Sequence, residues 1–363
     1  MSDQPQISAF DRSMMQQCLQ LAQRAAGKTA SNPLVGSVIV KDGQIIGEGF
    51  HPAFGEPHAE VFALRDAGEK AQGATVYVNL EPCNHYGKTP PCADALVKAK
   101  VAKVVTGMVD PDPRVAGGGI KKLRDAGIEV VVGVEEAACR QLNEAFIHRI
   151  LHQQTFGILK YAMTLDGKIA TTKGHSAWVT SKASRHLVHQ LRSTCDAVII
   201  GGNTVRKDNP ILTTHGITAH NPLRVVMSRS LDLPADCNLW HDNQAQTLIF
   251  TENDNAAQQQ KLSSDQTNII TVAALTPKIV AEHLYQQNLS KTLWECGGTL
   301  AAKAIADGTI QKVMAFIAPK IIGGTKAPSP VGDLNLSLMT DALELKRVTS
   351  QAISSDILIE GYL

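Results

Sequence analysis

Long apolar runs and an excess of either charge are both missing from this sequence of 363 residues. No stretch reaches the roughly 18 consecutive apolar residues of a membrane-spanning helix, so we expect no membrane partner. The N-terminus, MSDQPQISAFDRS, lacks the basic and apolar regions of a secretory signal, which predicts a cytoplasmic protein. The net charge of +1 leaves no basic excess for nucleic acid and favours a small-molecule substrate.

Cysteine is sparse, with seven residues in the chain. An odd number in a long chain without a secretion signal is typical of reduced thiols and indicates metal binding or catalysis before disulfides. The hydrophobic fraction of 44% is ample for a globular core and excludes a disordered chain. The length predicts two domains, which we place at residues 1–150 and 151–363, with 148–154 as the linker.

Helical and strand patterns alternate in both halves, which predicts an α/β fold for each. In the first half we expect a helix over 13–26, a hairpin turning at Asp42-Gly43 and a single long helix over 135–150. This order favours a three-layer α/β/α domain. In the second half, residues 254–267 are rich in Gln, Asn and Ser and are expected to form a solvated loop or a frayed helix.

The strongest chemical signal is His58-Ala59-Glu60, followed by Pro82-Cys83 and Pro91-Cys92. This H-x-E … P-C … C order is typical of zinc-dependent deaminases. His58, Cys83 and Cys92 would fill three tetrahedral positions of zinc and leave the fourth for water. Glu60 would carry the proton from that water to the departing amine. Pro57 and Pro82 each precede an expected helix start, where the helix dipole favours thiolate.

A closed zinc site that only stabilises the fold is the alternative interpretation. It needs a fourth ligand, for which His51 and His85 are near in sequence, and it leaves Glu60 unexplained. A second loop, residues 110–119, ends in Gly117-Gly118-Gly119 before an expected helix. Its backbone N–H groups could bind a phosphate, or the loop could be flexible without a ligand.

The spacing of the cysteines narrows the choice of deaminase. Nucleoside and nucleic-acid deaminases usually have two residues between them, and here there are eight. EPCNHYGKTPPC, with SNPLVGSVIV upstream, resembles the deaminase half of the bifunctional riboflavin-biosynthesis deaminase/reductases. That resemblance implies a cytidine-deaminase-like fold and a pyrimidinone substrate carrying a ribose 5-phosphate. It also implies four substrate contacts: Asn32, His51, His85 and Lys88.

The second half has no G-x-G-x-x-G and no Walker motif, so a Rossmann dinucleotide fold is not supported. Glycine pairs instead follow two expected strands, at Gly201-Gly202 and Gly297-Gly298, where backbone amides could bind a pyrophosphate. The strings LKYAMTLDGKIA, HSAWVTS, GGNTVRKDNPILTT, LWECGGTLAAKAI and FIAPKIIGG resemble the reductase half of the same family. That half resembles dihydrofolate reductase and uses NADPH.

Carried over residue by residue, the resemblance implies two groups of contacts in the second half. The cofactor group is Ala162, Trp178, Thr204, Asp208, Gly297, Gly298, Thr299, Leu300, Ala301, Ala302 and Lys303. The substrate group is Ser176, Arg192, Leu212, His215 and Glu295. Arg192 would pair with the substrate phosphate and Glu295 with sugar hydroxyls. His215 departs from the family, because many members have an arginine there.

The resemblance therefore implies a bifunctional enzyme with zinc and NADPH as cofactors. It would deaminate 2,5-diamino-6-ribosylamino-4(3H)-pyrimidinone 5′-phosphate and then reduce the ribosyl chain to give 5-amino-6-ribitylaminouracil 5′-phosphate. One alternative is a nucleoside or tRNA-type zinc deaminase fused to an unrelated α/β domain. The other is a non-catalytic, zinc-stapled binding protein. A homo-oligomer, dimeric or tetrameric, is expected for both folds.

Overall fold

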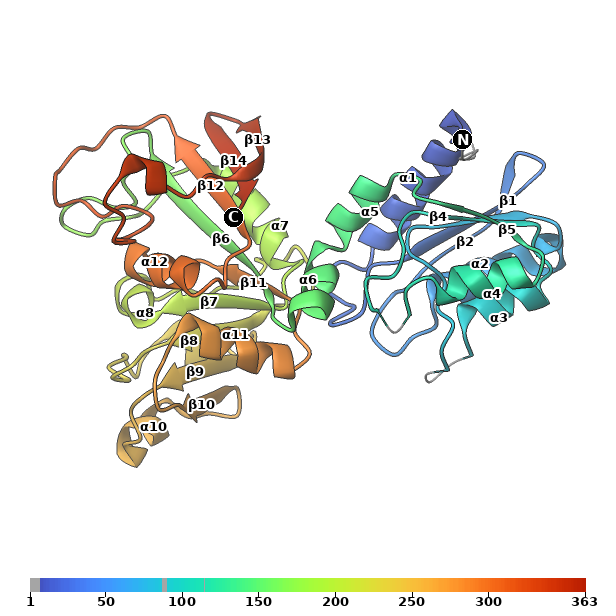
Figure 1. Ribbon diagram of the computed structural model, residues 1–363. Helices are drawn as coiled ribbons and strands as arrows, with labels where there is room; N and C mark the ends of the chain where they lie inside the picture. The colour runs from blue at the N-terminus through green and yellow to red at the C-terminus, as the bar shows by residue number, and fades with distance from the viewer. Residues whose placement is uncertain (1–6, 87–89, 114) are drawn as a thin grey trace. The chain divides into compact units, whose positions relative to one another are not determined.

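The computed structural model describes residues 7–86, 90–113 and 115–363 (Figure 1). The chain divides into two compact units, Met1–Gln153 and Gln154–Leu363. None of the described helices has both the length and the apolarity needed to cross a membrane.

The first unit is a five-stranded sheet between two layers of helices (Figure 1). Its strand order is β2-β1-β3-β4-β5, and β1 runs antiparallel to both of its neighbours. The apolar, valine-rich strands β3 to β5 are parallel, as expected for strands covered on both faces. The strands are β1 (Gly36–Lys41), β2 (Gln44–Phe50), β3 (Thr75–Val78), β4 (Lys103–Thr106) and β5 (Glu129–Val132).

Helices α1 and α5 lie on one face of this sheet, and α2, α3 and α4 lie on the other (Figure 1). A capping box starts α1: the Asp11 N–H donates to Ser8 Oγ, and the Ser8 N–H donates to the Asp11 carboxylate. The helices of the unit are α1 (Ala9–Gln23), α2 (Ala59–Ala67), η1 (Gly68–Ala71), α3 (Cys92–Lys98), α4 (Gly118–Asp125), α5 (Glu136–Leu142) and α6 (Glu144–His152).

One expectation for the first unit is wrong. The single helix over 135–150 is two helices, broken at Asn143. At this break the Asn143 side chain pairs with the backbone of Leu34. Its Oδ1 accepts the Leu34 N–H at 2.8 Å, and its Nδ2 donates to the Leu34 carbonyl at 3.0 Å. The boundary between the two units lies within the expected linker over 148–154, most of which is the helical end of α6. The hairpin at Asp42-Gly43 is confirmed by the pairing of Lys41 with Gln44.

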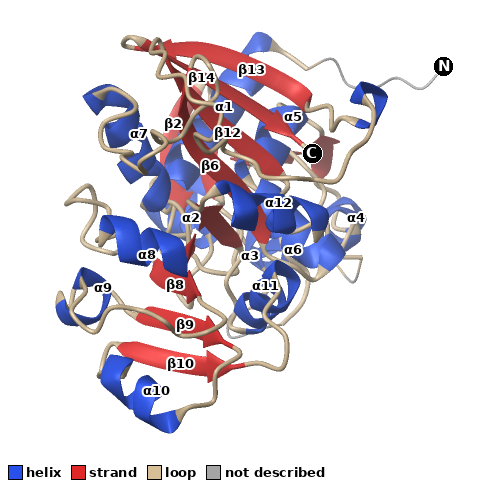
Figure 2. Ribbon diagram, turned by 90° about the vertical axis from the view of Figure 1, so that its left-hand side faces the viewer, coloured by secondary structure: helices blue, strands red, loops and turns tan. Residues whose placement is uncertain are grey.

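The second unit is built on a nine-stranded sheet (Figure 2). The strand order is β10-β9-β8-β7-β11-β6-β12-β14-β13, parallel except where β14 pairs with β12 and β13. The strands are β6 (Phe156–Thr164), β7 (Ala197–Gly201), β8 (Leu223–Met227), β9 (Thr247–Thr251), β10 (Thr267–Thr271), β11 (Lys291–Trp294), β12 (Lys312–Ala318), β13 (Lys346–Ile353) and β14 (Asp356–Tyr362). The helices are α7 (Lys182–Arg192), α8 (Gly202–Asp208), α9 (Asn238–His241), α10 (Ala256–Leu262), α11 (Pro277–Gln286), α12 (Gly298–Ala306) and η2 (Met339–Asp341).

Strands β10, β13 and β14 have no counterpart among the strands expected from the sequence, which cover residues 156–163, 196–201, 224–227, 247–251, 292–296 and 313–318. β13 is exposed along almost its whole length, so no alternation of apolar and polar residues marks it. The polar segment 254–267 contains the short helix α10, started by the Asn255 side chain. The α/β architecture predicted for both halves is confirmed.

Candidate active sites

Three candidate zinc ligands meet at one point of the first unit. His58 Nδ1 lies 3.2 Å from Cys92 Sγ and 3.5 Å from Cys83 Sγ, and the three ligand atoms lie within 4.8 Å of one another. In a tetrahedral zinc site, Zn–N near 2.0 Å and Zn–S near 2.3 Å separate such atoms by roughly 3.5 Å. The donor set and its spacing therefore fit zinc.

The local structure explains why these side chains converge. His58 is the N-cap of α2, and Cys92 is the first residue of α3. The expected helix start after Pro82 is wrong, because Cys83 lies in the loop before α3. Cys83 nevertheless reaches that helix end through space, since the Cys92 N–H donates to its sulfur at 3.2 Å. Hydrogen bonds from Cys92 and His58 outweigh burial and lower the pKa of Cys83 to about 4, which favours the metal-binding thiolate.

Glu60 lies in the first turn of α2, beside the ligands but outside the three-residue cluster. Its side chain is buried, and it lines a cavity of about 250 Å³ together with His58 and Cys83. Burial, reinforced by the nearby Cys83, raises the pKa of Glu60 to about 7. A carboxyl group with that pKa can both accept and donate a proton at neutral pH.

Asn32 and His51 form a second polar pair in the same cavity. His51 Nδ1 lies 3.1 Å from the Pro57 carbonyl oxygen and therefore carries the proton, so its Nε2 accepts a hydrogen bond from Asn32 Nδ2 at 3.0 Å. Burial lowers the pKa of His51, which keeps the ring neutral. With its amide nitrogen bound to His51, Asn32 presents Oδ1 as an acceptor for a ligand N–H.

The closed zinc site is not supported by the described residues. Both ring nitrogens of His51 are hydrogen-bonded, and His85 lines the cavity without joining the ligand cluster. Lys88, the fourth expected substrate contact, lies outside the described residues. The glycine loop does not offer its amides to a phosphate either, because the Gly117 and Gly119 N–H groups donate to the carboxylate of Glu81.

In the second unit, a cavity of about 460 Å³ opens at the turn between β11 and α12. An ideal Cβ at Gly298 would lie 2.6 Å from the Ser329 carbonyl oxygen, so only glycine fits this turn. The expected residues that line the cavity are Ser176, Thr204, Asp208, Gly297, Gly298, Thr299, Leu300 and Lys303.

Four residues of the expected cofactor group do not line this cavity. Ala301 and Ala302 are buried in α12, where Ala301 joins the hydrophobic core and supports the turn from behind. Ala162 lies within β6. Trp178 lines a neighbouring cavity with Ser176 and Asp208.

Trp178 is 68% exposed, which contradicts ordinary core packing for this side chain. Its φ of 60° is rarely adopted by a bulky residue. Two cations hold it: the Arg185 guanidinium lies 4.2 Å from the ring centroid, and Lys320 Nζ donates to its carbonyl at 2.7 Å. The indole is therefore held in place while its surface stays accessible to solvent.

Arg192 and Glu295 are bound to each other. Arg192 Nε and Nη2 donate to the two carboxylate oxygens at 2.6 and 3.1 Å, and Nη1 donates to the Thr213 carbonyl at 3.0 Å. Lys160, which sequence reasoning missed, reaches Glu295 at 3.4 Å. Although burial opposes ionisation, these two cations lower the pKa of Glu295 to about 2. The signal that could have identified Lys160 from the sequence is the presence of a lysine inside the otherwise apolar strand β6.

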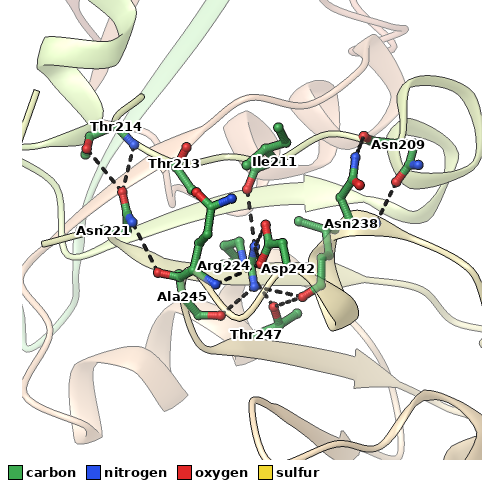
Figure 3. Close-up of polar contacts among 12 residues, drawn as sticks. Asn209, Ile211, Thr213, Thr214, Asn221, Arg224, Asn238, Asp242, Ala245 and Thr247 are labelled. Atoms are coloured by element: carbon green, nitrogen blue, oxygen red, sulfur yellow. Dashed lines mark hydrogen bonds and ion pairs between the residues drawn. The ribbon is translucent and has the colours of Figure 1, made fainter. Parts of the chain in front are cut away.

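Leu212 and His215 lie in a segment that is anchored through its other residues. Figure 3 shows Ile211 bound by Arg224, and Thr214, whose N–H donates to Asn221 Oδ1 at 2.9 Å. The buried Arg224 donates to both carboxylate oxygens of Asp242 at 2.8 Å and to the Ile211 carbonyl at 3.4 Å. Leu212 is buried with a φ of 57°, and it lines neither of the two cavities described in the second unit. The His215 ring stacks on His189, with centroids 4.0 Å apart.

Comparison with known proteins agrees with both sites. Residues 8–108 match the family described as "Cytidine and deoxycytidylate deaminase zinc-binding region", and residues 155–359 match "RibD C-terminal domain". Riboflavin biosynthesis protein RibD of Synechocystis sp. is 60% identical over 97% of this chain and 96% of that protein. This chain belongs to the RibD family.

Solved RibD structures match across both units. RibD of Acinetobacter baumannii superposes with a TM-score of 0.86 at 37% identity, over 97% of this chain and 98% of that one. A Thermotoga maritima diaminohydroxyphosphoribosylaminopyrimidine deaminase/5-amino-6-(5-phosphoribosylamino)uracil reductase gives 0.89 at 35% identity, with the same coverage. Among plant relatives, chloroplastic PYRR of Arabidopsis thaliana is 43% identical, and the match covers 61% of its length.

The chain is therefore a bifunctional enzyme of riboflavin biosynthesis, with a zinc-dependent deaminase and an NADPH-dependent reductase of RibD type. The RibD C-terminal match excludes the fusion of a deaminase with an unrelated α/β domain. The family also excludes a non-catalytic zinc protein.

Proposed function

We propose that residues 1–150 convert 2,5-diamino-6-ribosylamino-4(3H)-pyrimidinone 5′-phosphate to 5-amino-6-(5-phosphoribosylamino)uracil, and that residues 151–363 reduce this product to 5-amino-6-ribitylaminouracil 5′-phosphate. The observation that carries the proposal is the presence in one chain of a zinc triad beside Glu60 and of a glycine turn at the cavity that holds Thr204 and Asp208. Assays with each pyrimidine separately test it, and failure to release ammonia from the first would contradict it.

In the deaminase, His58, Cys83 and Cys92 hold zinc, which when bound supplies Lewis-acid activation of water. Glu60 accepts a proton at its carboxylate from the attacking water and delivers it to the exocyclic nitrogen. A carbon–oxygen bond forms, the carbon–nitrogen bond breaks, and ammonia leaves. Asn32 Oδ1 accepts an N–H of the pyrimidine, while His51 orients the Asn32 amide.

The remaining deaminase contacts, His85 and Lys88, are assigned to the phosphorylated ribose. In the reductase, NADPH supplies the hydride when bound. The backbone of the Gly297–Lys303 turn would hold its pyrophosphate, with Ala301 and Ala302 behind that turn. Thr204, Asp208, Trp178 and Ala162 are assigned to the rest of the cofactor. Ser176, Arg192, Leu212, His215 and Glu295 are assigned to the substrate.

The metal assignment predicts which thiols matter. The double variant Cys83→Ser, Cys92→Ser should lose the single zinc of each subunit, because two of the three ligand atoms are gone. Cys139→Ser is the matched control: this thiol is buried in the same unit, and its contact with the Val134 carbonyl suits a hydroxyl. Elemental analysis of the purified protein measures zinc, and full occupancy in the double variant would refute the ligand set.

We also propose that the protein works in the cytosol as a homo-oligomer. All seven cysteines are free, as a reducing compartment requires, and cell fractionation tests the location. The second unit exposes apolar side chains, among them Ile321, Leu338, Met339 and, in the edge strand β13, Val348. Light scattering should show a dimer or tetramer, and Val348→Lys should weaken it. A wild-type monomer at micromolar concentration would refute this assembly.

A further inference from the structure

We propose that Glu81 is a positioning residue of the deaminase. Its buried carboxylate holds the backbone that forms one side of the zinc cavity, and by doing so it sets the affinity for the pyrimidine. We call residues 110–113 and 115–120 the cavity wall. The proposal rests on the zinc cavity being the deaminase site.

Both carboxylate oxygens of Glu81 are fully used inside the protein. Oε2 accepts the N–H groups of Asp110 at 3.1 Å and Gly117 at 2.9 Å. Oε1 accepts those of Gly119 at 2.9 Å and Ile120 at 3.1 Å. An ionised carboxylate has about four acceptor positions, and here each is filled by a backbone amide. The side chain is only 3% exposed, so water cannot replace these bonds without opening the wall.

These bonds do more than cap a helix. Gly119 and Ile120 lie in the first turn of α4, but Asp110 lies eight residues before that helix begins. One side chain therefore ties both ends of the wall together. The backbone of Glu81 adds a further link, because its own N–H donates to the Met108 carbonyl at 2.9 Å.

The wall is also pressed against the segment that carries a zinc ligand. An ideal Cβ at Gly119 would lie 1.9 Å from the Pro82 carbonyl oxygen, so only glycine allows this approach. Pro82 separates Glu81 from Cys83. The zinc ligand Cys83 is therefore only two residues away along the chain from Glu81, whose carboxylate holds the wall.

The wall contributes polar groups to the cavity. Asp110, Asp112 and Val115 line it together with Glu81, Cys83 and Glu60. The Asp112 N–H donates to Asp110 Oδ1 at 2.8 Å, which orders the carboxylate of Asp110. A substrate that reaches the zinc must lie against these groups. Loosening the wall should therefore weaken binding while the metal and Glu60 stay in place.

Glu81→Gln in the full-length zinc enzyme tests this. The amide nitrogen of Gln faces two backbone donors that it cannot accept from, so about half of the bonds are lost. We expect the deaminase KM to rise roughly tenfold to a hundredfold, because bonds to a charged group are among the stronger ones. The kcat, the zinc content and the reductase activity should stay near the wild-type values. Hydrogen exchange should become faster at the amides of Asp110, Gly117, Gly119 and Ile120.

Asp196→Asn in the second unit is the matched control. Asp196 also accepts two backbone N–H groups, from Ser290 at 2.7 Å and Lys291 at 2.8 Å. The substitution Asp196→Asn should lower thermal stability and leave the deaminase KM unchanged. If Glu81→Gln fails to fold, Glu81→Asp keeps the charge on a shorter side chain and should raise KM in the same direction.

Faster exchange at the four amides with an unchanged KM would overturn the proposal, because the wall would then have no part in binding. Loss of zinc together with activity would also overturn it, since Glu81 would then act on Cys83. The exchange measurement needs no substrate. A wild-type enzyme that is inactive on the pyrimidine would therefore contradict the proposed function and not the anchoring by Glu81.

Discussion

Glu60→Gln should abolish deamination while leaving reduction nearly normal. Gln has the same size, so the packing of this buried side chain and the three zinc ligands should persist. It cannot take up or release a proton, and general acid–base catalysis contributes about 10²–10⁴-fold. We expect at least that loss in deaminase kcat, and more because one residue handles several transfers. Ammonia release measures it.

The same preparation supplies the internal control. The reductase has its own cavity and its own glycine turn at Gly297, so reduction of the deaminated pyrimidine should stay within about threefold of wild type. Glu136→Gln, which removes an exposed carboxylate paired with Arg140, should change neither activity. If Glu60→Gln abolished both activities while keeping zinc and fold, a shared site or obligate coupling would have to replace two independent sites.

Glu295→Ala should impair the reductase and cause the deaminated intermediate to accumulate. Removing the carboxylate leaves the buried Arg192 and the partly buried Lys160 without their acidic partner, and breaking a buried pair costs about 3–5 kcal/mol. Because Arg192 Nη1 also donates to the Thr213 carbonyl, displacement of Arg192 should disturb the segment from Leu212 to His215, which is assigned to the substrate. We expect reductase kcat/KM to fall at least about a hundredfold. NADPH oxidation and chromatography of the products measure both effects.

Glu360→Gln provides the comparison, since it removes the partner of Lys312 at a distance of 3.5 Å in the same unit but outside both cavities. Reduction should be unaffected.

The low pKa of Glu295 also predicts how the effect of Glu295→Ala depends on pH. Its folded-state pKa of about 2 lies below the usual 4.5, so its stabilising charge is complete above pH 4.5 and is lost only as the pH falls towards 2. The variant's deficit should therefore be the same from about pH 6 to pH 8. Normal reduction by Glu295→Ala would refute its assignment to the site.

The chemistry of the deaminase was readable from the sequence because its ligands carry their own signature. A histidine followed by two cysteines at this spacing is rarely found without a metal, which identified His58, Cys83 and Cys92. The role of Glu60 followed from its position two residues after His58. The resemblance extended this to the reductase and to NADPH. The α/β class was readable too, since strand and helix periods depend only on neighbours along the chain.

Contacts between distant residues could not be read in this way. The four amides bound by Glu81 and the pairing of Asn143 with Leu34 arise only when separate segments pack together. The ion pair of Arg192 with Glu295 joins residues 103 positions apart and gives two separately predicted residues one shared arrangement. Strand β13 depends on pairing with β14 rather than on its own pattern. Residue chemistry is local and is written in the sequence, whereas partners and pKa values depend on burial and on neighbours that only the tertiary structure supplies.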